Sequence, residues 1–237
     1  MDKSIPVISL SNVNDCDGII RDMSFDVLEK TVTGFVGLNG SGKTTTIKTI
    51  LQFKKLSSGT IKYFGDQKFS NETRSLVGFL PERPYFYPFL TGNEFLKLHW
   101  DLHFSKSTKF ELKKNYWLNR LDLKSAQSTK LKNYSKGMLQ RIGIAQSLIH
   151  DPKLIIWDEP MSGLDPLGRQ LIREILLEKK DEGVTIFFSS HLLQDIKELC
   201  DRIVIINKGR NFFEGPLSEF EVEGENLEQT FLTKIKS

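Results

Sequence analysis

The chain has 237 residues, of which 39% are hydrophobic and 27% are charged. That length suits one large α/β domain with a sizeable core and leaves little room for a second independent domain. The net charge of +3 is too small to indicate a nucleic-acid partner, so we expect none.

The first 90 residues are predicted to be rich in β structure. Residues 12–18 are rich in turn-forming types, and residues 43–51, which follow a glycine-rich stretch, are predicted to be helical. The segments with strand-like composition are residues 5–10, 19–28, 32–38, 60–64 and 76–80.

The character of the sequence changes at residue 91. Apolar residues over 91–127 repeat with a period near 3.6, which predicts a mostly helical insert. After Pro152 strands and helices alternate, which predicts a mainly parallel sheet with helices on both faces. The predicted strands are 154–157, 184–189 and 202–207, and the predicted helices are 167–182 and 192–200. The glutamate-rich tail, 218–237, is expected to hold a short helix and a loose end.

A phosphate-binding motif follows the third predicted strand. The segment GLNGSGKT, residues 37–44, fits the pattern G-x-x-x-x-G-K-[ST] between a strand and a helix. Glycines let backbone N–H groups turn inward around an anion, and the helix N-terminus adds its positive end. Lys43 is expected to reach the β- and γ-phosphates, and the Thr44 hydroxyl to hold Mg²⁺. The candidate nucleotide-binding residues are Asn39, Gly40, Ser41, Gly42, Lys43, Thr44 and Thr45.

Two carboxylates, Asp158 and Glu159, end the apolar segment 154–157. The carboxyl end of a strand is where α/β sheets present groups to ligands. Asp158 is expected to organise Mg²⁺, and Glu159 to align and deprotonate an attacking water. A strand that ends in an acidic turn is common by itself, and the pairing with a phosphate loop favours the catalytic interpretation.

A further motif lies between these two sites. The segment YSKGMLQR, residues 134–141, resembles the LSGGQ signature of ABC-type ATPases. Other family motifs occur in order: GFLPE (78–82) resembles the Q-loop, SGLD (162–165) the D-loop, and SSH (189–191) the switch histidine. The resemblance extends from about residue 5 to residue 215.

The resemblance implies a P-loop NTPase core with a mainly parallel sheet, an N-terminal antiparallel β subdomain and an inserted α-helical subdomain. The core is expected over 1–90 and 150–217, and the insert over 91–149. It also implies a head-to-tail dimer, in which one subunit's phosphate loop faces Ser135 and Gly137 of a second ATPase subunit. Asp165 is then expected to link the two sites, His191 to contact the γ-phosphate, and Glu82 to approach Mg²⁺.

Three features depart from the common family pattern. Lys136 and Met138 replace glycine and glutamine in the signature, and Glu82 replaces the Q-loop glutamine. The altered signature and the Q-loop glutamate both resemble the branch of ABC ATPases that serves drug, peptide and antibiotic exporters. The family often stacks adenine on an aromatic residue before the phosphate loop, but that position falls near Asn14 or Cys16 and no aromatic precedes Phe25.

Two weaker features have alternative interpretations. His99 and His103 are spaced as a metal pair on a helix, but no third ligand is near in sequence, and an ordinary helix face is the preferred interpretation. The aromatic segment 84–89 is equally consistent with a receptor surface for a short helix of a membrane partner and with a packed loop.

The predicted function is an ATPase subunit, with ATP and Mg²⁺ as cofactors, that drives an integral membrane permease, with export favoured over import. Apolar runs in the chain are strand-sized, well below the roughly 20 residues that span a bilayer, and no signal peptide is expected. Cys16 and Cys200 match no metal or redox spacing, which suits a reducing cytosol. We therefore expect a cytoplasmic location, peripheral on the membrane. The alternatives are a non-transport ABC ATPase and, less favoured, a P-loop kinase or GTPase.

Overall fold

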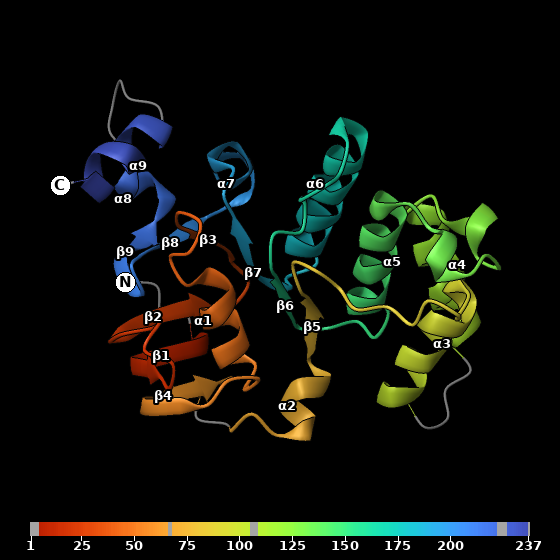
Figure 1. The fold of residues 1–237 in the computed structure, drawn as a ribbon, viewed down its shortest axis with the longest axis horizontal. Coiled ribbons are helices and arrows are strands. Elements are labelled where there is room, and N and C mark those ends of the chain that lie inside the picture. Colours follow the sequence, from red (N-terminus) through yellow and green to blue (C-terminus); the bar gives the residue numbers. More distant parts are fainter. Residues whose placement is uncertain (1–4, 66–67, 105–108, 222–226, 237) are drawn as a thin grey trace.

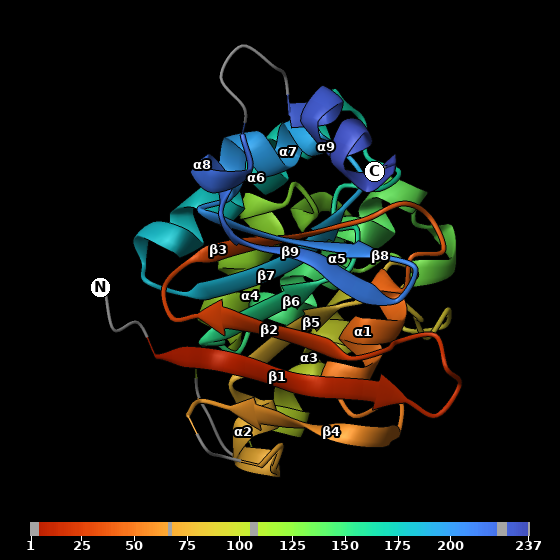
Figure 2. The same cartoon turned by 90° about the vertical axis from the view of Figure 1, so that its left-hand side faces the viewer.

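The computed structural model describes residues 5–65, 68–104, 109–221 and 227–236, and its strands form two sheets (Figure 1). The strands β1 (Pro6–Asp15), β2 (Met23–Leu28) and β4 (Leu56–Tyr63) form an antiparallel sheet in the order β2-β1-β4, and they run side by side in Figure 2. The larger sheet has the order β5-β6-β7-β3-β8-β9, in which all neighbours are parallel except β8 and β9. Its strands are β3 (Val32–Val36), β5 (Val77–Leu80), β6 (Leu154–Trp157), β7 (Thr185–Ser190), β8 (Arg202–Asn207) and β9 (Arg210–Pro216).

Helices cover the larger sheet and extend beyond one of its edges. The helices α3 (Gly92–His103) and α4 (Phe110–Arg120) contact α5 (Lys136–Leu148), which in turn contacts β5 (Figure 1). The remaining helices are α1 (Lys43–Ile50), α2 (Asn71–Ser75), α6 (Pro166–Asp181), α7 (Leu193–Leu199), α8 (Leu217–Phe220) and α9 (Leu227–Lys236), with 3₁₀ turns at Lys124–Ala126 and Leu131–Asn133. The predicted α/β fold, with a mainly parallel sheet, an antiparallel N-terminal sheet and a helical insert, is confirmed.

The central strands β3, β6 and β7 of the larger sheet are buried on both faces. Along β6, Ile155 and Trp157 belong to the core shared with the helical insert, whereas Leu154 and Ile156 belong to the core shared with the antiparallel sheet and α1. This alternation follows from the two-residue period of a strand. A strand buried on both faces reads as a continuous apolar run, which is why 154–157 was recognisable from sequence.

The structure corrects several predicted boundaries. The strand β1 continues to Asp15 through the segment predicted as a turn. Its pairing with both neighbours shifts register near Asn12, which has φ 49°, and this irregularity lets the strand continue past the turn-forming residues. Residues 19–22 lie outside β2, contrary to the prediction.

Other elements were not predicted. These are α2, β9 and a second helix in the tail, where α8 and α9 flank residues 222–226, which lie outside the described residues. The strand β9 returns along β8 after a tight turn at Lys208 and Gly209, both with positive φ. Among the described helices, none is long and apolar enough to cross a membrane.

Candidate active site

The phosphate loop connects β3 to α1 and closes around a lysine. The Lys43 ammonium group donates hydrogen bonds to the carbonyl oxygens of Gly37 at 2.7 Å and Leu38 at 3.4 Å. Gly42, at φ 109°, caps α1 without a side-chain hydrogen bond. The first N–H groups of α1 are therefore available to an anion, as the sequence pattern predicts.

A cavity of about 500 Å³ adjoins this loop. It brings together most of the residues predicted from sequence for the nucleotide and the catalytic step, namely Asn39, Gly40, Gly42, Lys43, Thr44, Thr45, Glu82, Glu159 and His191. Within the phosphate loop and the carboxylate pair, the predicted residues Ser41 and Asp158 do not line it. Ser41 is buried and its carbonyl accepts the Gly209 N–H at 2.9 Å, and Asp158 is only 1% exposed.

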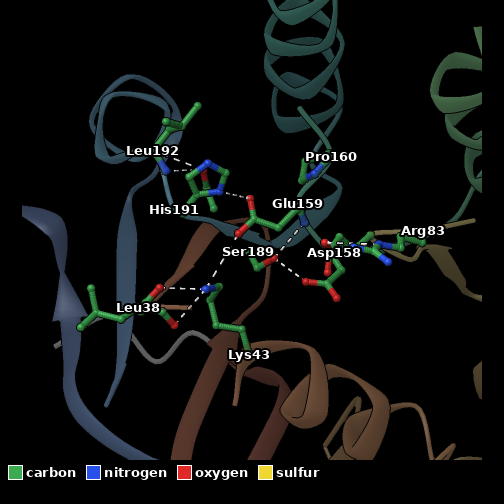
Figure 3. A network of polar contacts seen from close by, with 12 residues as sticks. Leu38, Lys43, Arg83, Asp158, Glu159, Pro160, Ser189, His191 and Leu192 are labelled. Carbon is green, nitrogen blue, oxygen red and sulfur yellow. Dashed lines mark hydrogen bonds and ion pairs between the residues drawn. The ribbon is translucent and has the colours of Figure 1, made fainter. Parts of the chain in front are cut away.

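Asp158 and Glu159 are held by a buried serine on the neighbouring strand. The Ser189 hydroxyl donates to Asp158 Oδ1 at 2.6 Å and accepts the Glu159 N–H at 2.8 Å. Figure 3 shows Glu159 between two nitrogen-bearing side chains: His191 Nδ1 lies 2.7 Å from Glu159 Oε2, and Lys43 Nζ lies 3.9 Å from Oε1. A carboxylate in this position can accept a proton from a water in the cavity.

The residues predicted for Mg²⁺ suit that ion only in part. Among the described residues, no three His, Cys, Asp or Glu side chains are grouped so that they could hold a metal by themselves. Mg²⁺ commonly keeps several waters and takes one or two carboxylates plus substrate phosphates, so a complete protein cage is not required. Thr44 and Glu82 line the cavity, and Asp158 lies behind it with one carboxylate oxygen bonded to Ser189. This oxygen set fits an ion that arrives with a nucleotide.

The signature segment lines a different cavity. Ser135, Gly137 and Asp165 border a space of about 480 Å³, and none of the described residues lines both this space and the first cavity. The Ser135 hydroxyl accepts the Met138 N–H at 3.2 Å and so caps α5, as Asp165 caps α6 by accepting the Gly168 N–H at 2.7 Å. Each helix therefore begins at this second cavity with its N–H groups.

Lys136 points elsewhere. Its side chain lies over Gly163, where an added Cβ would come within 2.6 Å of Lys136 Cε, and it lines a third cavity together with Glu82 and Ser162. The lysine that replaces a signature glycine is thus directed toward the D-loop of its own chain.

Two residues of the first cavity were not predicted, Ile19 and Ser162. Ser162 opens the D-loop motif, so its proximity could have been inferred from that motif. Ile19 lies in a segment whose apolar composition predicts a strand, and no local sequence pattern marks it as a residue of the cavity.

The histidine pair acquires a third neighbour through the fold. The ring of His150 stacks on His103 with centroids 4.0 Å apart and planes 24° apart, and His150 Nε2 donates to the Val77 carbonyl at 3.1 Å. Near-parallel stacked rings do not direct their nitrogens at a common point, so this contact does not form a metal site. Burial lowers the pKa of His150 and of His99 to about 4.

Comparisons with known proteins agree with this geometry. Residues 20–162 match the family model described as ABC transporter. An uncharacterized ABC transporter ATP-binding protein of Synechocystis is 43% identical over 209 residues, which cover 84% of this chain and 57% of that protein, so the chain spans little more than half of that relative.

Solved structures show the same fold. A structure described as the ATP binding subunit of an ABC transporter has a TM-score of 0.88 at 28% identity, and covers 96% of this chain and 99% of its own. A dimeric ATP-binding cassette bound to ADP and Pi has a TM-score of 0.80 at 20% identity, and covers 89% of this chain and 98% of its own.

Proposed function

Because this chain belongs to the ABC transporter family as an ATP-binding subunit, we propose that it hydrolyses ATP and energises a separate membrane-embedded transporter. Its working form is a head-to-tail dimer with a second ATPase subunit. The location that follows is the cytoplasmic face of the membrane, and export is the favoured direction because Glu82 and Met138 resemble the exporter branch.

One observation carries the proposal. The phosphate loop and the signature segment of a single chain border separate cavities, yet both present helix N-termini suited to phosphate oxygens. A γ-phosphate held by Lys43 can therefore meet a signature only if a second subunit provides it. Head-to-tail association of two chains completes two such sites.

The chemistry in each site follows from the contacts of Glu159. Water attacks the γ-phosphorus, the bond from that phosphorus to the bridging oxygen of ADP breaks, and Glu159 accepts the proton of the water. His191, which is bonded to Glu159, orients that carboxylate, and Lys43 neutralises charge on the phosphates. When bound, Mg²⁺ supplies further charge neutralisation beside Thr44, Glu82 and Asp158.

The proposed contact with the permease is the aromatic segment that follows Glu82. Tyr85 is 83% exposed and Phe89 is 73% exposed, and a cavity of about 380 Å³ beside them is lined by Arg83, Pro84, Phe86 and Leu139, among other residues. Exposed aromatic side chains are enriched at protein interfaces, and the pocket combines the apolar Pro84, Phe86 and Leu139 with polar and charged residues. The pocket also includes Glu82 and Ser162, which line the nucleotide cavity, so a partner seated there has a direct route to it.

The composite site is tested by mixing two inactive variants. Lys43→Ala removes the phosphate contact, and Ser135→Arg blocks the site of the neighbouring subunit. Each alone should release almost no phosphate, whereas an equal mixture should recover about a quarter of wild-type activity, because half the dimers hold one intact site out of two. Ser128→Arg, at an exposed serine outside both cavities, is the matched control and should stay active. Full activity of Ser135→Arg as a dilute monomer would contradict the composite site.

A further inference from the structure

The nucleotide cavity contains an apolar surface that neither the sequence motifs nor the catalytic scheme uses. Of the described residues that line it, Ile19 is the only hydrophobic one, and its side chain is 41% exposed. Ile19 Cγ2 lies 3.6 Å from the point that a Cβ on Gly42 would occupy, which places it beside the start of α1. The isoleucine is therefore a neighbour of the phosphate loop.

The loop that carries Ile19 is fixed to the phosphate loop by hydrogen bonds. The Asp15 carboxylate accepts the Ile20 N–H at 2.7 Å, and the Arg21 N–H donates to the Gly209 carbonyl at 2.8 Å. Gly209 in turn donates its N–H to the Ser41 carbonyl at 2.9 Å. Ile19 is thus held in place relative to the phosphate loop by hydrogen bonds within the protein.

Asn14 and Cys16 are the positions near which the adenine-stacking residue of the family falls, and neither one contributes to the cavity. The Asn14 side-chain amide donates to the Asn12 carbonyl at 2.9 Å and to the Ser58 hydroxyl at 3.0 Å, and its oxygen accepts the Asp22 N–H at 3.1 Å. Neither Asn14 nor Cys16 lines the cavity. The Asn14 amide is occupied in holding the strand end together, which leaves Ile19 as the candidate contact for a base.

We propose that Ile19 forms the surface on which the purine base of the nucleotide rests, and that the site binds ATP and GTP with similar affinity. This inference rests on the proposed nucleotide-binding function. The triphosphate and ribose of a nucleotide are polar, and the face of the base is the part that gains most from an aliphatic contact. An isoleucine side chain has no donor or acceptor, so it contacts the face of a purine without distinguishing the edge of adenine from that of guanine.

The test compares nucleotides with a ligand that lacks a base. Calorimetric dissociation constants are measured for ATP, GTP and inorganic tripolyphosphate, each with Mg²⁺, on the full chain. Ile19→Ala should weaken ATP and GTP alike by about five- to tenfold and leave tripolyphosphate unchanged, because only the base loses contact area. Ile19→Tyr should tighten both nucleotides and leave tripolyphosphate unchanged, because an aromatic ring stacks on a base.

The control is Ile5→Ala, which shortens an exposed isoleucine outside the cavity and should change none of the three constants. An equal loss of tripolyphosphate affinity, or no loss for ATP, in Ile19→Ala would overturn the proposal. A wild-type preference for ATP over GTP beyond about a hundredfold would show that another group reads the base. If wild type binds neither ATP nor tripolyphosphate, the nucleotide-binding function itself fails, which separates that outcome from failure of the Ile19 contact alone.

Discussion

At the scale of single residues, the proposed chemistry depends on how Glu159 is held. Its backbone has φ 51°, a conformation uncommon for residues other than glycine, and its N–H is bonded to the Ser189 hydroxyl. The carboxylate contacts His191 on one side and lies near Lys43 on the other. These contacts orient an acidic group toward the cavity while both of its oxygens face positive or donor groups.

We expect Glu159→Gln to bind ATP with near-normal affinity and to turn over at least about a hundredfold more slowly, because the amide keeps the shape of the side chain but cannot accept the proton. Single-turnover phosphate release and nucleotide binding on the same preparation measure the two effects. Glu29→Gln, at an exposed glutamate outside the cavity, should retain wild-type turnover. Turnover of Glu159→Gln within a few fold of wild type would remove Glu159 from the role of base.

At the scale of elements, the turn between β8 and β9 supports the nucleotide cavity from outside. A Cβ at Gly209 would lie 1.8 Å from the Ile19 carbonyl oxygen, which is backbone and cannot rotate away. At Gly183, which has nearly the same positive φ, the Lys30 side chain alone among the described residues comes within 4 Å of such a Cβ. An alanine at either glycine would be strained by the positive φ, but only an alanine at Gly209 would also clash. Comparing the two substitutions therefore separates the free-energy cost of backbone strain from that of the clash.

Gly209→Ala should lower the free energy of unfolding by about 1–3 kcal/mol more than Gly183→Ala, because both carry the strain of positive φ and only the former overpacks. It should also weaken ATP binding, because the displaced loop carries Ile19. Urea unfolding and ATP titration of both variants make the comparison. Equal losses of stability in Gly209→Ala and Gly183→Ala would show that the backbone around Ile19 moves enough to accommodate the added methyl group without a further loss.

Two buried histidines, His99 on α3 and His150 just after α5, predict that the stability of the fold depends on pH. His99 and His150 have a pKa of about 4 in the folded chain, lowered by burial from an ordinary value of 6.5. Between these values the unfolded chain binds more protons, so stability is complete above pH 6.5 and falls as the pH is lowered, by up to about 1.4 kcal/mol per pH unit for each histidine.

Urea unfolding at pH 7.5 and pH 5 measures this slope. The His150→Gln variant keeps a hydrogen-bond donor but does not titrate, so its stability should fall less over the same interval. An unchanged slope in His150→Gln would contradict the assignment.

At the scale of the whole molecule, the aromatic segment gives a test of the proposed coupling to a permease. Replacing both Tyr85 and Phe89 by serine should leave the ATPase activity of the isolated subunit intact, because neither side chain lines the nucleotide cavity. It should reduce the activity of the subunit reconstituted with the proposed permease in liposomes by about tenfold or more, because exposed aromatics often anchor interfaces.

A matched pair of exposed apolar residues, Leu112 and Tyr116 on α4, provides the control when both are changed to serine. Equal loss in the two double variants would argue against a specific docking role for the aromatic segment.

The sequence alone predicted those features that depend on neighbouring residues. The strand, glycine loop and helix around Lys43 are encoded locally, because glycine spacing and the helix start lie within about ten residues of each other. The buried strand at 154–157 was recognisable from its continuous apolar run, and the resemblance of the ordered motifs indicated the family. Positions such as Ile19 were not recognisable, because their importance comes from contacts with residues distant in the chain.

Tertiary structure decided which residues meet. It brought Glu82, Glu159 and His191 from three separate segments to the phosphate loop, and it kept Ser135 in a different cavity. It also placed Gly209 between Ile19 and Ser41, a contact that spans most of the chain. The physical reason is that parallel strands end at a common edge of the sheet, where side chains far apart in sequence converge. The order of the strands in the sheet determines which of these side chains become neighbours.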